Sequence, residues 1–296
     1  MASAVRPRRS VLYMPGSNAR ALEKARTLAA DALILDLEDA VAPEAKSAAR
    51  EQVCAAVGAG GYGRREVVIR VNGLDTPWGD EDLAAAAASG ADAILLPKAE
   101  SAAMVRDAEA LMARNGAPDE MALWCMIETP LGVLHAEEVA GAGARLACLV
   151  MGTSDLTKEL GARHTAARTP MLASLALSVL AARAHGRAIL DGVHLDLDDE
   201  KGFVAACQQG LELGFDGKTL IHPKQIAPCN RAFAPSTDEL AWSHRIIEAF
   251  AEAEAEGKGV TVVDGRLVEN LHVENARRVL TLAQAIAELE GAAAPA

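Results

Sequence analysis

Short apolar runs alternate along the chain with alanine-rich amphipathic stretches. Eight such runs occur between residues 10 and 223, and most are apolar at consecutive positions rather than at every second one. Continuous apolar runs of this length are typical of parallel strands that are covered on both faces. The runs are SVLYM (10–14), DALILDLE (31–38), EVVIRVN (66–72), DAILLPK (92–98), ALWCMIET (122–129), LACLVMG (146–152), AILDGV (188–193) and GKTLIHP (217–223).

The stretches between these runs are predicted helices. Residues 18–30 and 101–116 combine good helix formers with apolar residues spaced three and four apart. Eight strand–helix units in series predict a (β/α)8 barrel, which we assign to residues 8–235. A doubly wound parallel sheet carries the same local signals and is the alternative.

The chain continues past the eighth unit into a C-terminal extension, residues 236–296. Its first part predicts a helix over 237–259 with Thr237 as the cap. A hairpin over 260–268 and a final amphipathic helix over 272–290 follow. The extension is too small for an independent domain, so we expect a lid or a subunit-contact arm.

Composition places the chain among globular proteins and limits its partners. Apolar residues make up 51% and charged residues 24%, with a formal net charge of −12. The acidic excess argues against nucleic-acid binding, although a local basic cluster can still bind an anionic small molecule. There is no run of about 18 apolar residues and no apolar segment after the basic N-terminus. We therefore expect a cytoplasmic protein without a membrane span or a secretory signal.

Two familiar patterns carry no chemistry here. The cysteines show no C-x-x-C spacing, so we expect free and mostly buried thiols rather than a disulfide framework or a zinc site. They are Cys54, Cys125, Cys148, Cys207 and Cys229. Gly58, Gly60 and Gly63 match G-x-G-x-x-G, but they close a predicted helix and lead into a strand, which is the reverse of a dinucleotide-binding turn.

Two carboxylates stand out at the carboxyl ends of consecutive predicted strands. Glu128 and Asp155 should lie roughly 5 Å apart at one rim of a barrel. Two such carboxylates repel unless a proton or a cation lies between them, and Mg2+ or Mn2+ would suit this oxygen-rich rim. The alternative is that each residue caps the helix that follows.

Arg70 lies among β-branched residues, in VVIRVNG, where a solvated arginine is not expected. We expect its guanidinium to point toward the metal rim, where it could bind a carboxylate or a developing oxyanion. A buried structural ion pair with Glu38 is the alternative. Asp36, Glu38 and Asp39 crowd the end of the second strand, and some of them should orient Arg70 or hold water on the metal.

Lys98, at a strand end, suggests a Schiff-base mechanism as a rival. It lies beside an acidic rim, which should raise its pKa and weaken it as a nucleophile. We expect it to neutralise charge or to bind an anion.

The segments at nearly every strand end then point to a family. They are SVLYMPGSNARALEKA, DALILDLEDAVAPEAKSAAR, VVIRVNGLDT, AILLPKAES, MIETPLGV, MGTSDLTKELG, ILDGVHLDL and LIHPKQI. Together, and in this order, they resemble the citrate lyase β-subunit/malyl-CoA lyase family of CoA-ester lyases.

The resemblance implies a (β/α)8 barrel that forms trimers or hexamers, with a C-terminal segment that helps to cover a neighbouring subunit's site. It implies Mg2+-dependent, reversible cleavage of a 3-hydroxyacyl thioester such as malyl-CoA. The products would be acetyl- or propionyl-CoA and a 2-oxo acid such as glyoxylate. Glu128 and Asp155 are then the metal ligands, and Arg70 is the substrate arginine. The residues implied to contact CoA are Tyr13, Arg20, Lys24, the Asp36–Asp39 loop, Ile221, His222 and Pro223.

The sequence departs from the family near its end. Members with a G-x-M-V-D-x-P segment place an aspartate over a neighbouring active site as the acid or base, whereas this chain has GRLVENLHV with Glu269 at that position. Glutamate has one more methylene of reach, so geometry decides whether it can serve. We therefore count Glu269, Asp36 and Glu38 as candidate acid–base residues beside Arg70.

The leading hypothesis is a Mg2+-dependent acyl-CoA lyase acting on malyl-CoA or a methylated analogue. A malyl-CoA-type thioesterase, a citryl-type lyase subunit that works with an acyl carrier, and a non-catalytic CoA- or metal-binding module are the alternatives.

Overall fold

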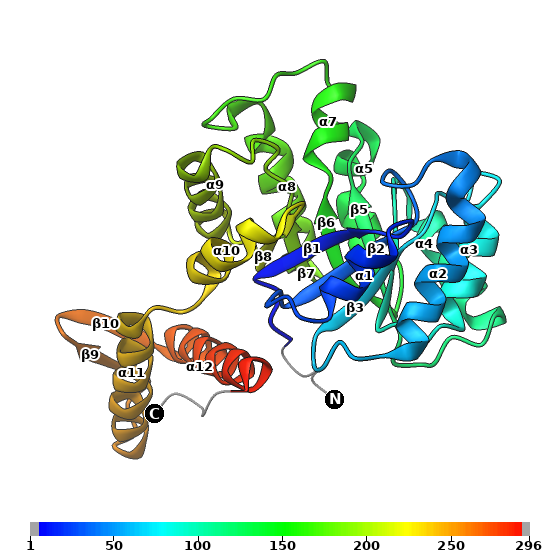
Figure 1. Ribbon diagram of the computed structural model, residues 1–296. Helices are drawn as coiled ribbons and strands as arrows, with labels where there is room; N and C mark the ends of the chain where they lie inside the picture. Colours follow the sequence, from blue (N-terminus) through cyan, green and yellow to red (C-terminus); the bar gives the residue numbers. More distant parts are fainter. Residues whose placement is uncertain (1–5, 292–296) are drawn as a thin grey trace. The chain divides into compact units, whose positions relative to one another are not determined.

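The structure is a computed structural model that describes residues 6–291. Eight parallel strands close into a barrel in chain order, with β1 paired to β8, so the barrel prediction is confirmed and the doubly wound alternative is wrong (Figure 1). The strands are β1 (Ser10–Pro15), β2 (Ala32–Asp36), β3 (Glu66–Arg70), β4 (Ala93–Leu96), β5 (Ala122–Ile127), β6 (Leu146–Met151), β7 (Ala188–Asp191) and β8 (Gly217–Leu220).

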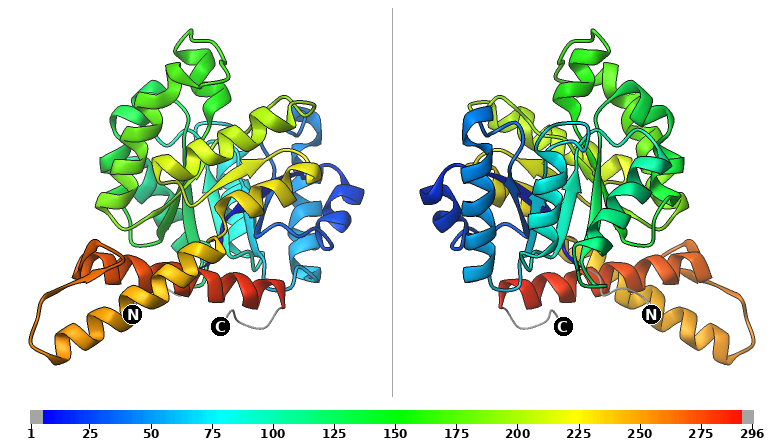
Figure 2. Two further views of the ribbon diagram at one scale, coloured as in Figure 1. Left: turned by 90° about the vertical axis from the view of Figure 1, so that its left-hand side faces the viewer. Right: turned by 90° about the vertical axis from the view of Figure 1, so that its right-hand side faces the viewer.

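Helices surround these strands, as two further views also show (Figure 2). They are α1 (Ala19–Ala25), α2 (Lys46–Ala59), α3 (Gly79–Ala87), α4 (Ala102–Arg114), α5 (Pro130–Leu134), α6 (Ala136–Gly141), α7 (Thr153–Glu159), α8 (Leu172–Ala184), α9 (Glu200–Leu213) and α10 (Ile226–Phe233), with short 3-10 turns η1 (Pro43–Ala45), η2 (Thr169–Met171) and η3 (Pro223–Gln225).

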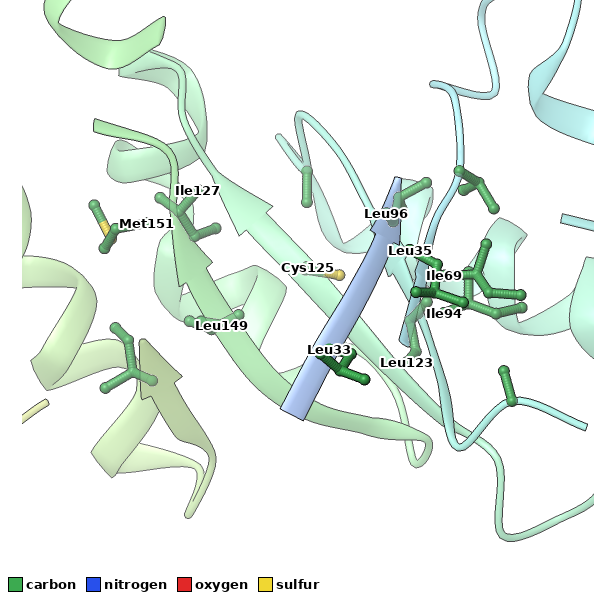
Figure 3. Packing of buried hydrophobic residues seen from close by; sticks show 14 of the residues in the cluster. Leu33, Leu35, Ile69, Ile94, Leu96, Leu123, Cys125, Ile127, Leu149 and Met151 are labelled. Carbon is green, nitrogen blue, oxygen red and sulfur yellow. The ribbon is translucent and has the colours of Figure 1, made fainter. Parts of the chain in front are cut away.

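The continuous apolar pattern of the strands follows from burial on both faces. On β2, Leu33 and Leu35 belong to the core between barrel and helices, whereas Ile34 belongs to the barrel interior. All three side chains are fully buried. Figure 3 shows the outer of these two cores, where side chains of the neighbouring strands β2, β3 and β4, among them Leu35, Ile69 and Ile94, pack together.

An ion pair and an aromatic ring lie within the barrel toward the amino ends of the strands. Arg8 donates to both carboxylate oxygens of Glu66, at 2.7 and 2.8 Å, and lies 5.0 Å from the ring centre of Trp124. Trp124 is fully buried and Glu66 nearly so. The carboxyl ends of the strands are therefore the ones left open for chemistry.

The remaining sequence predictions for the barrel unit can be checked locally. Helix α2 ends at Ala59 and β3 begins at Glu66, so the glycines of the G-x-G-x-x-G pattern do connect a helix to a strand. The cysteines are free, and all of them except the half-buried Cys54 are buried.

The chain divides into two compact units, one of them Arg8–Phe233 and the other beginning at Ala234. The second unit holds α11 (Thr237–Ala255), a hairpin of β9 (Val260–Val263) and β10 (Arg266–Glu269), and α12 (Asn270–Glu290). It has a small core of its own, made of Ile246, Phe250, Val268, Val273 and Ala276.

Three details of this second unit differ from the prediction, the first being that α11 ends at Ala255 rather than at residue 259. The cap of α11 is Ser236 rather than Thr237, because the Ser236 hydroxyl accepts a hydrogen bond from the Glu239 N–H. Helix α12 begins at Asn270, two residues earlier than expected, so Glu269 is the residue that precedes it. Across residues 6–291, no helix is long and apolar enough to cross a membrane.

Candidate active site

A pocket at the carboxyl ends of the strands collects side chains from across the barrel. Tyr13, Arg70, Glu128, Asp155 and Ile221 all line it, and they come from β1, β3, the end of β5, α7 and the end of β8. The structure therefore brings the two predicted metal ligands and the predicted substrate arginine to one site.

Arg70 is buried at the centre of an acidic cluster. It is 6% exposed, and its Nε and Nη2 donate to the two oxygens of Asp36 at 2.7 Å each. Its Nη1 lies 2.9 Å from Glu38 Oε2 and 3.1 Å from Asp39 Oδ2. Burial alone would lower the pKa of Arg70, but Asp36 and the other acids raise it well above its ordinary value. The ion pair considered as the alternative for Arg70 is thus present, and the same guanidinium also lines the pocket.

The carboxylates around Arg70 differ in how many of their oxygen lone pairs already accept hydrogen bonds. Asp36 receives Arg70 and also the backbone N–H groups of Glu38 and Ala40, at 2.9 and 3.1 Å. Its oxygens are therefore occupied. Burial raises the pKa of Glu38 to about 8, with Arg70 acting in the opposite direction. Glu38 is thus the better placed of these two residues to exchange a proton near neutral pH.

Tyr13, predicted to contact CoA, lies inside the mouth of the barrel. The Arg70 guanidinium lies 4.9 Å from its ring centre, and its hydroxyl contacts Met126 Sδ at 3.8 Å. Burial raises its pKa above the ordinary value, although Arg70 opposes the shift. Tyr13 therefore lines the same pocket as Arg70, and its uncharged ring packs against the guanidinium.

Glu128 follows β5 directly and is held in place by two neighbouring strands. The backbone N–H of Lys98, after β4, donates to Glu128 Oε1 at 2.8 Å. Gly152, after β6, packs so closely that a β-carbon there would overlap Glu128. Burial raises the pKa of Glu128 to about 7; Lys98 and Arg70 oppose the shift, and Asp155 adds to it. The cap of α5 is Thr129, so Glu128 does not serve as a helix cap.

Asp155 lies in the first turn of α7, beyond the strand end where its position had been predicted. The helix begins early, at Thr153, and this turn brings Asp155 into the pocket. Its neighbour Ser154 also lines the pocket, and the Ser154 hydroxyl is buried without a hydrogen-bond partner. A buried hydroxyl of this kind fits a polar ligand, because an unsatisfied one costs free energy.

The residues present fit a hard divalent cation. No three His, Cys, Asp or Glu side chains among residues 6–291 are grouped to hold a metal by themselves. Mg2+, however, retains several waters and takes only one or two protein carboxylates. Glu128 and Asp155 supply that set, and a cation would offset the repulsion between them.

Lys98 combines a strained backbone with a half-exposed side chain. Its φ angle of 48° is in the left-handed region, which non-glycine residues seldom adopt. Its Nζ lies 3.9 Å from Glu38 Oε1. Burial lowers the pKa of Lys98, but Glu38 and Glu128 outweigh that effect and raise it. The pKa direction expected for Lys98 is confirmed, and it disfavours a Schiff-base nucleophile.

The other residues predicted to contact CoA take different positions. Arg20 and Lys24 are exposed one turn apart on α1. Ile221 lines the pocket and is 38% exposed. His222 caps the turn that begins at Pro223, because its Nδ1 accepts the Lys224 N–H. Their roles toward CoA stay predictions.

Glu269 belongs to the second unit, at the junction of β10 and α12. Its backbone N–H donates to His272 Nδ1 at 3.1 Å, and its side chain is half-buried. Its role as an acid or base stays a prediction.

Comparison with known proteins identifies the family. A family model described as HpcH/HpaI aldolase/citrate lyase matches residues 9–223. The chain belongs to the HpcH/HpaI aldolase/citrate lyase family. It is 53% identical to (3S)-malyl-CoA thioesterase of Cereibacter sphaeroides, over 97% of this chain and 98% of that protein. It is 34% identical to L-malyl-CoA/beta-methylmalyl-CoA lyase of the same species, over 96% and 97% of the two chains.

A solved structure of a similar protein shares the fold. It is CitE of Mycobacterium tuberculosis in complex with magnesium, acetoacetate and coenzyme A, with a TM-score of 0.74 and 31% identity over 92% of this chain and 97% of that chain. The resemblance found in the sequence is therefore confirmed, and the protein is an enzyme of the citrate lyase/malyl-CoA lyase type.

The sequence did not reveal three residues that support the site, namely Gly152, Ser154 and Lys46. Gly152 fits against Glu128, and Ser154 adds a hydroxyl to the pocket. Lys46 binds the carbonyl groups of the turn that carries Glu38. A lone glycine, serine or lysine gives no signal in one sequence, because each is also common on exposed surfaces.

Proposed function

We propose that this protein is a Mg2+-dependent CoA-ester lyase that acts on malyl-CoA or a close 3-hydroxyacyl-CoA. The observation that carries the proposal is that Arg70, Glu128 and Asp155 line the same pocket. The products would be acetyl- or propionyl-CoA and a 2-oxo acid such as glyoxylate. The fit of the pocket to a hard divalent cation and the magnesium complex of CitE support the choice of metal.

Glu128 and Asp155 would hold Mg2+, or Mn2+ in its place, at the rim. When bound, this cation supplies Lewis-acid polarisation of the carboxylate and carbonyl oxygens of the 2-oxo acid and orients them. The residues of the chain then have two tasks, which are to stabilise the charge on the acyl half of the substrate and to move a proton.

Arg70 is placed for the first task. In the cleavage direction the substrate hydroxyl gives its proton to a carboxylate of the site, the bond between the hydroxyl-bearing carbon and the acyl α-carbon breaks, and the electron pair forms a thioester enolate. A guanidinium already fixed by three carboxylates stabilises that oxyanion without reorganising. Tyr13 shields one face of Arg70 from water.

A carboxyl group must perform the second task, which is to give the proton to the enolate carbon. Asp36 is occupied by its hydrogen bonds, which leaves Glu38 in the barrel and Glu269 in the second unit as the candidates. The same residue would remove the methyl proton in the condensation direction.

Hydrolysis of the same thioester is the second candidate function. The 53% identity to (3S)-malyl-CoA thioesterase favours it, as does Glu269 in place of the family's aspartate. Water would then attack the thioester carbonyl, and malate and CoA would leave, without cleavage of a carbon–carbon bond.

One assay separates these functions. Purified protein is incubated with malyl-CoA and Mg2+, with or without a chelator, and glyoxylate and free thiol are followed separately. Glyoxylate that appears without free thiol and disappears with chelator would support the lyase. Free thiol without glyoxylate would instead establish the thioesterase. No product from the isolated protein would point to a subunit that requires an acyl carrier.

We also propose that the protein works as a homotrimer or homohexamer. Helix α8 exposes Leu177 and Leu180 and α5 exposes Leu134, which is 76% exposed in the single chain. Apolar side chains in such positions are typical of subunit contacts. Light scattering of the purified protein would give the number of subunits.

A further inference from the structure

Lys46, the first residue of α2, is a lysine whose charged end is buried. It is 6% exposed. Its Nζ donates to the carbonyl oxygens of Leu37 and Glu38, at 3.0 Å each, and lies 5.2 Å from the ring centre of Trp78. Within residues 6–291, these two carbonyls and the ring are the partners of its ammonium group, and no carboxylate pairs with it.

This arrangement has a thermodynamic cost. Removing an ammonium group from water without a carboxylate partner is unfavourable, and a methionine of similar length would pack there without that cost. The burial of Lys46 in spite of this cost indicates that its role is to fix the backbone that it binds. Leu37 and Glu38 form the turn between Asp36, at the end of β2, and Asp39.

The same turn determines how Arg70 is held. Asp36 accepts the backbone N–H groups of Glu38 and Ala40 on one side, while Lys46 holds the carbonyls on the other. The Glu38 carboxylate lies 2.9 Å from Arg70 Nη1. A shift of this backbone would therefore move the carboxylate and rotate the guanidinium away from the pocket.

Asn72, two residues after the end of β3, donates a further hydrogen bond to the same turn. Its Nδ2 donates to the Leu37 carbonyl at 2.9 Å, so that carbonyl receives two side-chain donors. Asn72 is itself bound by the buried Asp82. The turn is thus attached to α2 and, through Asn72, to the residues that follow β3.

We propose that Lys46 is a positioning residue for the reaction. It fixes the turn over residues 36–39 and, through the Glu38 carboxylate, sets the orientation of Arg70 toward the substrate. The catalytic part of this inference rests on the proposed function, whereas the fixing of the turn does not.

The test compares Lys46→Met with Lys201→Met, an exposed lysine in the first turn of α9. Lys46→Met removes the donor and retains most of the stem. We expect kcat on malyl-CoA to fall by about 10- to 100-fold, because a misplacement of about 1 Å costs up to this factor. KM for the thioester should change little, and Lys201→Met should match the wild type. Wild-type kcat in Lys46→Met would overturn the proposal.

A double-mutant cycle with Glu38→Gln separates positioning from a general structural effect. If Lys46 acts through the Glu38 carboxylate, the double variant loses less activity than the product of the two single losses. Fully multiplicative losses would overturn the proposal. If Lys46→Met does not fold, Lys46→Leu, which also lacks a donor, replaces it, and wild-type kcat in that variant would likewise overturn the proposal.

Amide hydrogen exchange provides a readout that needs no activity. The N–H groups of Glu38 and Ala40 should exchange faster in Lys46→Met, while those of the other strand ends keep their rates. Unchanged exchange rates at these two positions would overturn the inference that Lys46 fixes the turn. If the wild type converts no malyl-CoA, the proposed function has failed, and exchange alone then decides whether Lys46 holds the turn.

Discussion

Gly152 lies directly against Glu128, with no room for a side chain between them. A β-carbon at position 152 would overlap both Cβ and Oε2 of Glu128. The strand end that leads to Asp155 thus restricts the rotamer of the other candidate metal ligand. This contact joins two pocket residues that are 24 positions apart in the sequence.

The first prediction follows from that contact. Gly152→Ala should displace the Glu128 carboxylate and lower the apparent Mg2+ affinity by about 10- to 100-fold, as disturbed outer-shell partners do at metal sites. Activity measured against Mg2+ concentration tests it. Gly58→Ala is the control, because a β-carbon there meets nothing within 4 Å. An unchanged Mg2+ dependence in Gly152→Ala would show that Glu128 is not a metal ligand.

The second prediction concerns the ligands themselves. Glu128→Gln and Asp155→Asn should each reduce Mg2+-dependent turnover by at least about 100-fold and leave the circular dichroism spectrum unchanged, because each removes one anionic ligand without changing volume. Asp119→Asn, at a fully exposed aspartate, should behave as the wild type. Full turnover in either ligand variant contradicts the metal assignment.

The third prediction concerns Arg70. Arg70→Lys should lower kcat by about 10²- to 10³-fold, the usual cost of losing an oxyanion donor, while KM for the thioester changes less. A lysine offers one point charge and cannot bind several carboxylates while presenting an N–H to the substrate. Arg145→Lys, a substitution away from the pocket, is the control. A loss of stability with unaltered kcat would leave Arg70 a purely structural role.

The fourth prediction tests the acid–base residue. Glu269→Gln should lower turnover by about 10²- to 10⁴-fold if Glu269 transfers the proton, and Glu274→Gln, in the helix that follows Glu269, should not. Turnover that survives in Glu269→Gln would move the role to Glu38. Glu269→Asp restores the family's residue, so we expect it to raise the ratio of glyoxylate to free thiol.

The fifth prediction concerns stability. Arg8→Met removes the guanidinium that binds both carboxylate oxygens of the buried Glu66, so we expect it to lower the free energy of unfolding by about 3–5 kcal/mol. Urea denaturation measures this. Glu23→Gln, in an ion pair where Glu23 is 70% exposed, should cost less than about 1 kcal/mol. Equal costs for the two variants would contradict the assignment of a buried pair.

The fold could be predicted because its strands are buried on both faces. Leu33, Ile34 and Leu35 are apolar in succession, and alternate residues face the helices and the barrel interior. That pattern, repeated eight times with helices between, has few other solutions. The end of each strand then marks the rim, which is why Arg70 and Glu128 could be found without coordinates.

The parts that could not be predicted depend on contacts between distant segments. Asp155 was assigned to a strand end, but α7 begins at Thr153 and places it in a helical turn. Lys46 begins an amphipathic helix, where a lysine is normally solvated; only the fold brings the carbonyls of Leu37 and Glu38 to it. No local pattern reports such a tertiary partner.

The left-handed backbone at Lys98 separates two properties of the rim, the hydrogen bond to Glu128 and the positive charge at position 98. The N–H that binds Glu128 belongs to the main chain, so it persists with any side chain that tolerates this conformation, glycine and asparagine above all. The charge at this position can therefore be lost or replaced during evolution while the metal ligand keeps its hydrogen bond. Related enzymes could in this way change which anionic substrates they accept without rebuilding their metal site.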